Sequence, residues 1–434
     1  MPAVAFVSTR NSATTVSLSE AIARGLAPDG GLFLPVQIPA VNAFIDCDPG
    51  RLPSVARVAL AGFFEGDELE SHLPSIADAA LNVEAPTTRV AQCADPLHIM
   101  ELFHGPTAAF KDFGARFLAE CLQRLQPAEA APTTILVATS GDTGGAVAAA
   151  FHRRPWARVV ILFPKGLVSA RQEHQLTCWG DNVTALRIGG TFDDCQRMVK
   201  EAFMDQDLQR RYRFSSANSI NVGRLLPQLV YYAASSLQLQ RDGGIKPSYI
   251  IPSGNLGNVS AALWARLLGF PIGRIVLAHN LNRTVPDYLH SGVWEPRTSI
   301  LTLASAMDVG NPSNMERLRS KYPTVAELRE QISADSVDDA TIQSRIRADF
   351  QDWGREWCPH TATAAEVYRR LPADERRRPW VIVATAHPAK FNEVVEPLIG
   401  HAVRVPDSLA RLLKLPAQCT DIPPTLAALS ASIQ

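Results

Sequence analysis

Residues 133–151 read TTILVATSGDTGGAVAAAF, and this stretch indicates the fold class. The part TTILVAT (133–139) is apolar and rich in β-branched residues, which favours a buried strand. The small-residue run AVAAAF (146–151) favours a helix, and the turn residues 140–145 lie between the two. A buried strand that leads through a glycine-rich loop into a helix is typical of α/β sheets.

The same alternation continues on both sides of this stretch. Further strands are expected at apolar runs, namely 157–164, 182–190, 248–252, 274–280 and 380–387. Helical stretches separate most of these runs, which predicts right-handed βαβ units and parallel sheets covered on both faces. Residues 1–90 differ, because they mix short strand-like and helical pieces around the turn-rich APDGGLFLP. With 434 residues, the chain is expected to hold two or three domains.

A second glycine-rich loop has the same setting as the first. SYIIP (248–252) leads into Ser253-Gly254-Asn255-Leu256-Gly257-Asn258 and then into the helical VSAALWARLLG. Both loops should lie at the carboxyl ends of parallel strands, where free N–H groups at a helix start suit an anion. Neither loop ends in GK[ST] and neither has the GxGxxG spacing, so neither predicts a nucleotide site.

Lys111 lies in LFHGPTAAFKDFGAR (102–116) and opens a predicted helix, because apolar residues follow it at helical spacing. Desolvation and the helix dipole both disfavour its ammonium form, which makes Lys111 a candidate for Schiff-base chemistry. The alternative is an ordinary lysine with its head in water. Three features together favour pyridoxal phosphate as cofactor. They are the two anion-binding loops, this lysine and a third strand that ends in the hydroxyl of Thr385.

Composition excludes several other classes of protein. Lys and Arg number 42 against 43 Asp and Glu, and no basic run predicts a nucleic-acid partner. The seven cysteines are scattered without metal-ligand spacing, so no metal site is expected and the thiols should be reduced. No apolar run reaches the ~18 residues of a membrane span, and the start of the chain does not resemble a signal peptide. We expect a cytoplasmic protein without a membrane partner.

Several blocks of the chain resemble the threonine synthase family. LFHGPTxAFKD around Lys111 is similar to that family's pyridoxal-phosphate lysine signature. ATSGDTGGA, SSANSINVGR, PSGNLGN, AMDVGNPSN and TAHPAKF resemble further blocks in the family's order, so the resemblance covers nearly the whole chain. It implies the tryptophan-synthase-β-like class, in which the cofactor lies between a large and a small α/β domain.

The resemblance also implies domains and their arrangement. We expect an N-terminal α+β domain at 1–90, a large cofactor-binding domain at 91–133 and 217–434, and a small mobile domain at 134–216. The charged stretch near 321–355 is expected to be a peripheral helical insert of the large domain. The expected assembly is a monomer or a weak homodimer.

Carried over residue by residue, the resemblance implies cofactor-binding roles for three regions. Lys111 would form the Schiff base and move protons, and Thr385 would meet the pyridine nitrogen. The backbone amides of the second loop would hold the cofactor phosphate, that is those of Gly254, Asn255, Leu256, Gly257 and Asn258. The loop departs from the family pattern at two positions. Leu256 replaces the usual Phe, and Asn258 replaces a frequent Asp. These changes have no consequence if only the backbone amides bind the phosphate.

Substrate-binding roles follow in the same way. The loop of Ser140, Gly141, Asp142 and Thr143 would close on the substrate's α-carboxylate, although Asp142 could instead orient the loop. Asn218, Ser219 and Arg224 resemble residues that hold a substrate phosphate, with Lys165 as a possible helper. Arg224 could also merely start a helix and pair with a surface carboxylate, and Lys165 could be solvated.

These roles imply conversion of O-phospho-L-homoserine and water into L-threonine and phosphate. Two anion sites, one for each phosphate, favour this reaction over relatives that need one. The alternatives are a threonine or serine dehydratase, another β-replacement enzyme of the same class, or a catalytically silent homologue that only binds the cofactor or a phosphoester.

Overall fold

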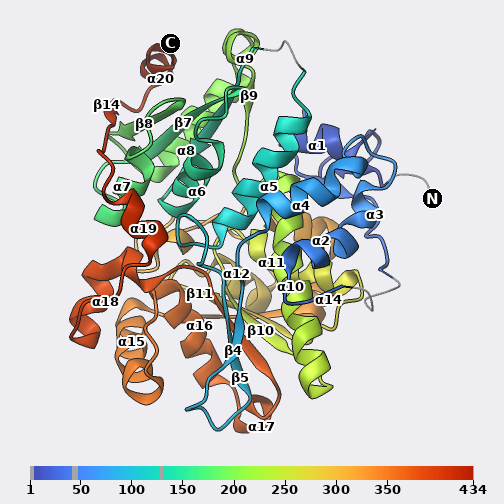
Figure 1. The fold of residues 1–434 in the computed structure, drawn as a ribbon, viewed down its shortest axis with the longest axis vertical. Coiled ribbons are helices and arrows are strands. Elements are labelled where there is room, and N and C mark those ends of the chain that lie inside the picture. Colours follow the sequence, from blue (N-terminus) through green and yellow to red (C-terminus); the bar gives the residue numbers. More distant parts are fainter. Residues whose placement is uncertain (1–3, 42–46, 128–130, 434) are drawn as a thin grey trace.

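The structure is a computed structural model that describes residues 4–41, 47–127 and 131–433. Within these residues the strands form three sheets, of six, five and three strands (Figure 1). No helix in the described part of the chain is long and apolar enough to cross a membrane. The α/β class expected from the strand–loop–helix alternation is confirmed.

The six-stranded sheet has the order β12-β11-β10-β13-β5-β4, and only β4 runs antiparallel to its neighbour. Its central strands are buried on both faces, since Tyr249 and Ile251 pack into one hydrophobic cluster and Ile250 into another. Parallel strands in such a setting are continuous apolar runs. The strands are β12 (Ile332–Ser336), β11 (Ile275–His279), β10 (Ser248–Pro252), β13 (Trp380–Ala384), β5 (Leu97–Glu101) and β4 (Thr87–Arg89).

Helices cover both faces of this sheet. The side chains of α10 and α11 share a cluster with Tyr249 and Ile251, whereas those of α15 and α16 pack with Ile250 and Ile382. The helices of this region are α5 (Lys111–Arg124), α10 (Val222–Gly243), α11 (Gly257–Leu267), α12 (Thr284–Ser291), α13 (Met315–Lys321), α14 (Val325–Gln331), α15 (Asp339–Trp353), α16 (Pro359–Arg370), α17 (Ala373–Arg376), α18 (Asn392–Ile399) and α19 (Asp407–Leu412), with short 3-10 turns η2 (Ser305–Met307) and η3 (Pro388–Phe391).

The five-stranded sheet has the order β14-β8-β7-β6-β9 and is parallel throughout. Its last strand in sequence, β14, pairs with β8 through Thr420 opposite Leu186, so the end of the chain returns to this sheet (Figure 1). This corrects the predicted division, which placed all of 217–434 in the large domain. The elements are β6 (Thr133–Ala138), β7 (Ala157–Pro164), β8 (Val183–Ile188), β9 (Phe214–Ser215), β14 (Thr420–Ile422), α6 (Asp142–Phe151), α7 (Ala170–Thr177), α8 (Phe192–Met204), α9 (Gln206–Tyr212) and α20 (Leu426–Ser432).

The charged stretch 321–355 is not the purely helical insert that was predicted. Between α14 and α15 the segment ISADS forms β12, which pairs in parallel with β11 at the edge of the six-stranded sheet. An edge strand has one free side, so its polar residues face solvent and the apolar signal of a strand is missing. The insert is therefore part of the sheet.

The N-terminal region carries the third sheet and packs firmly on the rest. Phe6 and Phe63 are buried in the same hydrophobic cluster as Phe117 of α5 and Leu229 of α10. Arg317 of α13 donates a 2.9 Å hydrogen bond to the carbonyl of Phe33. The elements are β1 (Phe6–Ser8), β2 (Thr15–Val16), β3 (Phe33–Pro35), α1 (Leu18–Arg24), α2 (Leu52–Ala59), α3 (Ala61–Phe64), η1 (Glu70–His72) and α4 (Leu73–Ala80).

Candidate active site

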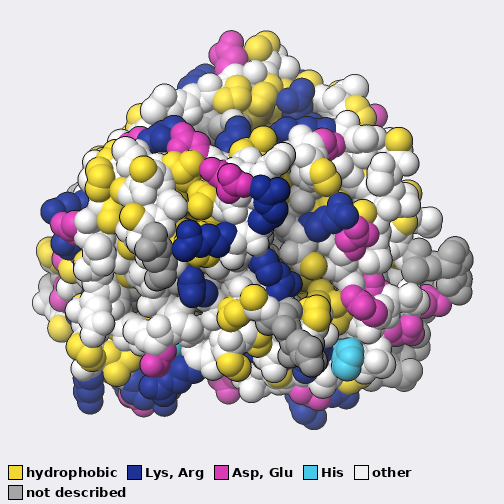
Figure 2. Space-filling view, turned by 90° about the horizontal axis from the view of Figure 1, so that it is seen from above, with side chains coloured by type: hydrophobic (Ala, Val, Ile, Leu, Met, Phe, Trp, Pro, Cys, Tyr) yellow, Lys and Arg dark blue, Asp and Glu magenta, His cyan; other side chains and the backbone are white. Residues whose placement is uncertain are grey.

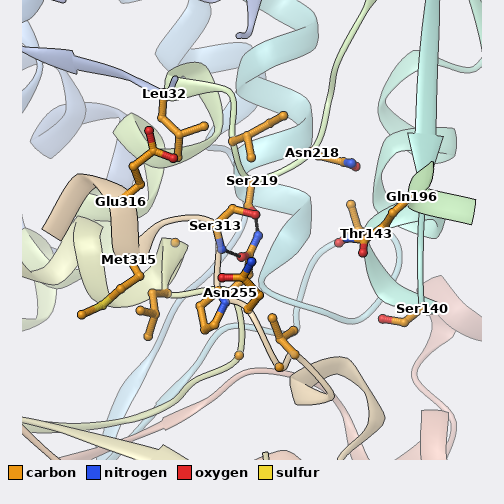
Figure 3. A pocket seen from close by; sticks show the side chains of 18 of the residues that line it. Leu32, Ser140, Thr143, Gln196, Asn218, Ser219, Asn255, Ser313, Met315 and Glu316 are labelled. Atoms are coloured by element: carbon orange, nitrogen blue, oxygen red, sulfur yellow. Dashed lines mark hydrogen bonds between the residues drawn. The ribbon is translucent and has the colours of Figure 1, made fainter. Parts of the chain in front are cut away.

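A cavity of 1360 Å³ contains most of the residues singled out from the sequence. The helix that begins at Lys111 and the loops that follow β6, β10 and β13 reach it, as does α8. Ser140, Thr143 and Gln196 lie on one side of it, whereas Ser219 and Asn255 lie on the other (Figure 3). Exposed cations also reach it, and Figure 2 shows a face on which Lys and Arg side chains gather around a hollow.

Lys111 is the first residue of α5, as predicted, and its side chain is partly buried in the cavity wall. The turn before it is fixed by Asp112, whose carboxylate accepts hydrogen bonds from the Thr107 backbone N–H (2.9 Å) and hydroxyl (2.7 Å). Burial lowers the pKa of Lys111 to about 8; Asp142 opposes this shift, and Arg224 and Lys390 add to it. Roughly a tenth to a fifth of this amine is therefore neutral near physiological pH, far more than for an ordinary lysine, and this neutral fraction is able to act as a nucleophile.

The second glycine-rich loop, 253–258, forms a rigid cradle at the start of α11. Leu256 has the left-handed φ of +59°, which a side chain rarely adopts. At Gly254 a Cβ would lie 2.9 Å from the Cα of Met307, so only glycine fits. Asn255 is held from two sides, since its Nδ2 donates to Ser219 Oγ at 2.6 Å and its carbonyl accepts from Asn314 Nδ2 at 2.8 Å. The free N–H groups at this helix start suit a phosphate.

Two polar residues complete this side of the cavity. Thr385 follows β13, is 5% exposed and lines the cavity, as do Gly254, Leu256, Gly257 and Asn258. The Oδ1 of Asn258 accepts hydrogen bonds from the hydroxyls of Tyr231 (2.5 Å) and Tyr232 (2.9 Å). Its buried Nδ2 has no partner among the described residues and remains a free donor.

The first glycine-rich loop is arranged differently. Ser140 and Thr143 line the cavity, but the side chain of Asp142 is buried and forms a 2.8 Å ion pair with Lys390. Gln172 of α7 also donates to Asp142 at 2.9 Å. Burial acts to raise the pKa of Asp142, but Lys390, and next Lys111, outweigh it and hold the pKa below its ordinary range. The carboxylate is thus held by Lys390 and Gln172, which favours the alternative that Asp142 orients the loop.

Gly141 holds a position in this loop that requires glycine. Its φ of +131° favours glycine, and a Cβ there would lie 2.7 Å from the Gln172 side chain. Thr139 Oγ1 accepts hydrogen bonds from the backbone N–H groups of Gly141 (3.0 Å) and Gly144 (2.9 Å). The backbone at the start of α6 is therefore fixed beside the cavity.

Arg224 is the most unusual cation of the site. It is 2% exposed, lines the cavity, and forms no ion pair with a carboxylate in the described part of the chain. Its Nη1 donates to the Ala217 carbonyl, and Nε has no partner among the described residues. Burial lowers the pKa of Arg224 to about 10. The carboxylate of Asp112 opposes this shift without forming an ion pair with Arg224, so the buried positive charge is only partly compensated. A ligand that supplies an anion would complete the compensation.

Residues of α10 and α5 allow Arg224 to approach Lys111. It lies in the first turn of α10, with Asn221 as the helix cap. Gly114 of α5 makes room for it, since a Cβ there would lie 2.7 Å from the Arg224 Nε. Its Nη2 is 3.5 Å from the Lys111 carbonyl oxygen, and Asn218 and Ser219 line the same part of the cavity. The alternative that Arg224 pairs with a surface carboxylate is therefore excluded.

Lys165 does not join the other predicted residues. Its side chain is 58% exposed and forms a 2.8 Å ion pair with Asp421 of β14. It follows β7 on the side where β14 runs along the five-stranded sheet, and it does not line the cavity. The predicted help with a substrate phosphate is corrected: this lysine is a surface cation.

Two residues of the site were missed by the sequence reasoning. Lys390 lies in the quoted block TAHPAKF but received no role. His360 is the second residue of α16, is 2% exposed and lines the cavity. The backbone N–H of Ala306 donates to His360 Nε2 at 3.0 Å, so the ring proton resides on Nδ1, and burial lowers the pKa of His360 to about 4. No local pattern marks either residue, because their neighbours in space are remote in sequence.

Comparison with known proteins agrees with this geometry. The family model "Pyridoxal-phosphate dependent enzyme" matches residues 83–386, and models of the threonine synthase N terminus and C-terminal region match residues 5–80 and 361–433. The threonine synthase of Escherichia coli is 39% identical over 95% of this chain and 95% of its own length. This chain belongs to the threonine synthase family.

Further relatives extend the match within the threonine synthase family. The threonine synthase of Haemophilus influenzae is 38% identical over 92% of both chains. The crystal structure of the Escherichia coli threonine synthase covers 98% of this chain with a TM-score of 0.88, and the pyridoxal-phosphate-bound threonine synthase of Brucella melitensis covers 99% with a TM-score of 0.90. The expected fold class is therefore confirmed, with its small N-terminal domain.

The residues of the cavity fit pyridoxal phosphate, the cofactor of this enzyme family. The cofactor needs a neutral lysine amine, a phosphate cradle and a partner for its ring nitrogen. Lys111 has a lowered pKa, and the loop around Gly254 admits a close backbone approach at a helix start. Thr385 presents a hydroxyl at the end of the neighbouring strand β13, in the same cavity.

Proposed function

We propose that this chain converts O-phospho-L-homoserine and water into L-threonine and phosphate, with pyridoxal phosphate as cofactor. The observation that carries the proposal is the pair of anion sites near Lys111. One is the cradle at the start of α11, and the other is the buried Arg224, which lacks a carboxylate partner among the described residues. A cofactor phosphate and a substrate phosphate would occupy one site each, and a relative that acts on unphosphorylated amino acids needs only the first.

The cradle residues 254–258 and Thr385 would hold the cofactor, which supplies an electron sink for negative charge on the substrate carbon. The Nζ of Lys111 would take up the α proton and later the β proton, because its lowered pKa suits a base that works near neutral pH. Phosphate would then leave from the γ carbon, and one of the two protons would return to that carbon. Water would add its hydroxyl at the β carbon and give its remaining proton to the released phosphate, and the second proton would return to the α carbon.

Arg224 would bind the substrate phosphate through charge-assisted hydrogen bonds, with Asn218 and Ser219 as neutral donors. Because that phosphate is also the leaving group, the guanidinium would stabilise the charge that grows on it during elimination. Ser140, Thr143 and the backbone at the start of α6 would hold the α-carboxylate. Since these residues lie across the cavity from Ser219 and Asn255 (Figure 3), substrate binding would bring the small domain, 134–216 with β14, toward the large one.

The test is an assay of phosphate release from O-phospho-L-homoserine, combined with chiral analysis of the amino-acid product. We expect phosphate and L-threonine in equal amounts. L-threonine and L-serine should be tested in parallel for release of ammonia, the activity of a dehydratase. Rapid ammonia release without phosphate turnover would contradict the proposal, and so would cofactor binding without any turnover.

A further inference from the structure

Lys390 is a fully buried lysine of the site to which the proposed reaction gives no role. It lies in η3, directly after the loop that contains Thr385, and its side chain is 0% exposed. Its Nζ donates to the carbonyl of Thr107 at 2.8 Å and forms the 2.8 Å ion pair with Asp142. Thr107 lies four residues before Lys111, and Asp142 opens α6 next to the five-stranded sheet. One ammonium group therefore joins the lysine segment to the first glycine-rich loop.

Helix α7 completes the same network. Gln172 donates to Asp142 at 2.9 Å, and Gln175 donates to the Thr107 carbonyl at 3.1 Å, so both acceptors of Lys390 are shared with α7. The hydroxyl of Ser169 also donates to the carbonyl of Lys390 at 3.1 Å. A buried ion pair whose two partners are also hydrogen-bonded to their surroundings holds its groups in one geometry, whereas an unsupported pair is costly.

We propose that Lys390 is a positioning residue that fixes the Asp142 loop and compensates the negative charge of the Asp142 carboxylate. As a consequence, the Lys111 nitrogen binds a proton less readily. This inference rests on the proposed function, because it assumes that Lys111 carries the cofactor. Asp142 alone would favour a positively charged nitrogen on Lys111. Lys390 places an opposite charge 2.8 Å from that carboxylate and weakens this effect.

The charged groups around Lys111 agree with this role. Asp142 raises the pKa of Lys111, whereas Arg224 and Lys390 lower it, and burial is the largest cause of the net lowering. The buried His360 and Cys358 are further titratable neighbours of Asp142. Burial lowers the pKa of His360 to about 4, so the ring is neutral above that pH, and burial raises the pKa of the Cys358 thiol, which therefore stays protonated. Removal of Asp142 and removal of Lys390 should thus shift the pKa of the Lys111 nitrogen in opposite directions. An ion pair with a purely structural role would not have this effect.

The test is a pH titration of the visible absorbance of the holoenzyme, which depends on the proton at the Lys111 nitrogen. Lys390→Met should move the midpoint upward by about one pH unit, because Asp142 then acts unopposed. Asp142→Asn should move it downward by a similar amount. The double variant should return toward the wild-type midpoint, and Lys390→Arg should restore part of it.

Asp349→Asn is the matched control for loss of a buried carboxylate. Asp349 is 0% exposed and forms a 3.0 Å ion pair with Arg369, but it does not line the cavity. This variant should lower the melting temperature without moving the midpoint. The inference would be overturned if Lys390→Met and Asp142→Asn moved the titration midpoint in the same direction, or if neither variant moved it.

Two further outcomes are decisive. If Lys390→Met does not fold, the isosteric Asp142→Asn decides alone, and an unchanged or raised midpoint would refute the role of the pair. If the wild-type protein shows no cofactor absorbance that is lost in Lys111→Ala, the proposed function fails, and the inference fails with it. A normal wild-type spectrum with unshifted variants would instead leave the proposed function intact.

Discussion

The two glycine-rich loops look alike in sequence but differ in how the structure holds them. Each leads from a buried parallel strand into a helix and lines the same cavity. The loop 253–258 is fixed inside the six-stranded part, where Asn255 contacts Ser219 and Asn314. The loop 140–145 belongs to the five-stranded part, and its acidic side chain is bound to Lys390 on the other part.

The different ways in which the two loops are held indicate that they bind different kinds of ligand. A loop that is fixed by several hydrogen bonds to one rigid body suits a cofactor that stays bound through every turnover. A loop that belongs to a second body, with a single ion pair as its charged link, suits a substrate that must enter and leave. We therefore propose that the same sequence pattern serves permanent binding of the cofactor in one place and transient binding of the substrate in the other.

Lys111 lines the same cavity as both loops and would carry the cofactor, so its removal should have the largest effect. Lys111→Ala should lower turnover of O-phospho-L-homoserine by at least about 10³-fold and remove the visible absorbance of bound cofactor. Enzyme assays and absorbance spectra of the purified variant measure this directly, with circular dichroism as a control for the fold. Near-normal threonine formation would refute the assignment.

Substitution of Arg224 separates effects on substrate binding from effects on cofactor binding. Arg224→Ala should lower kcat/KM by about 10²-fold through the loss of a bidentate charge-assisted contact, each hydrogen bond of which contributes about 1.5–3 kcal/mol. The cofactor absorbance should remain. Arg224→Lys should recover only part of the activity, because an ammonium cannot make the paired bonds of a guanidinium. Loss of the cofactor in Arg224→Ala would instead assign this residue to the cofactor phosphate.

Paired glycine substitutions test the rigidity of the two loops. Gly254→Ala would force a Cβ to within 2.9 Å of the Met307 Cα, so the cradle must shift and cofactor affinity should fall by about 10-fold. Gly145→Ala is the matched control in the first loop, where the nearest contact of the new Cβ is an ordinary 3.5 Å from Gln175. Equilibrium titration with pyridoxal phosphate compares the two variants. Equal losses in both would contradict a special role for the cradle.

Local patterns predicted the parts of the site that lie on a single strand–loop–helix unit. Lys111, the cradle loop and Thr385 were predicted because apolar runs mark the strands before them or the helix after them. Lys390 and His360 could not be predicted in this way, since their partners Asp142 and Ala306 are remote in sequence. The ion pair of Lys165 depends on Asp421 of β14, a three-residue strand without an apolar run that lies within the range 217–434 predicted for the large domain.

The smallest expected effect concerns the stability of the cofactor-free protein. The pKa of Lys111 is about 8 in the folded chain and near 10.5 in the unfolded chain. Below pH 8 both states carry the proton, so the folded state bears the full cost of a buried ammonium. Between pH 8 and 10.5 the unfolded state binds more protons, and stability therefore rises with pH.

Lys111→Met removes this cost at every pH. The cofactor-free variant should melt higher than cofactor-free wild type at pH 7, by on the order of 2 °C, and the difference should shrink as the pH rises through 8 toward 10.5. Melting temperatures at several pH values measure the trend, and the exposed Lys246→Met is the control that should show none. A difference that stays constant or grows with pH would mean that Asp142 holds the Lys111 ammonium more strongly than burial disfavours it. The first glycine-rich loop would then carry a charge that acts directly on the lysine in addition to its contact with Lys390.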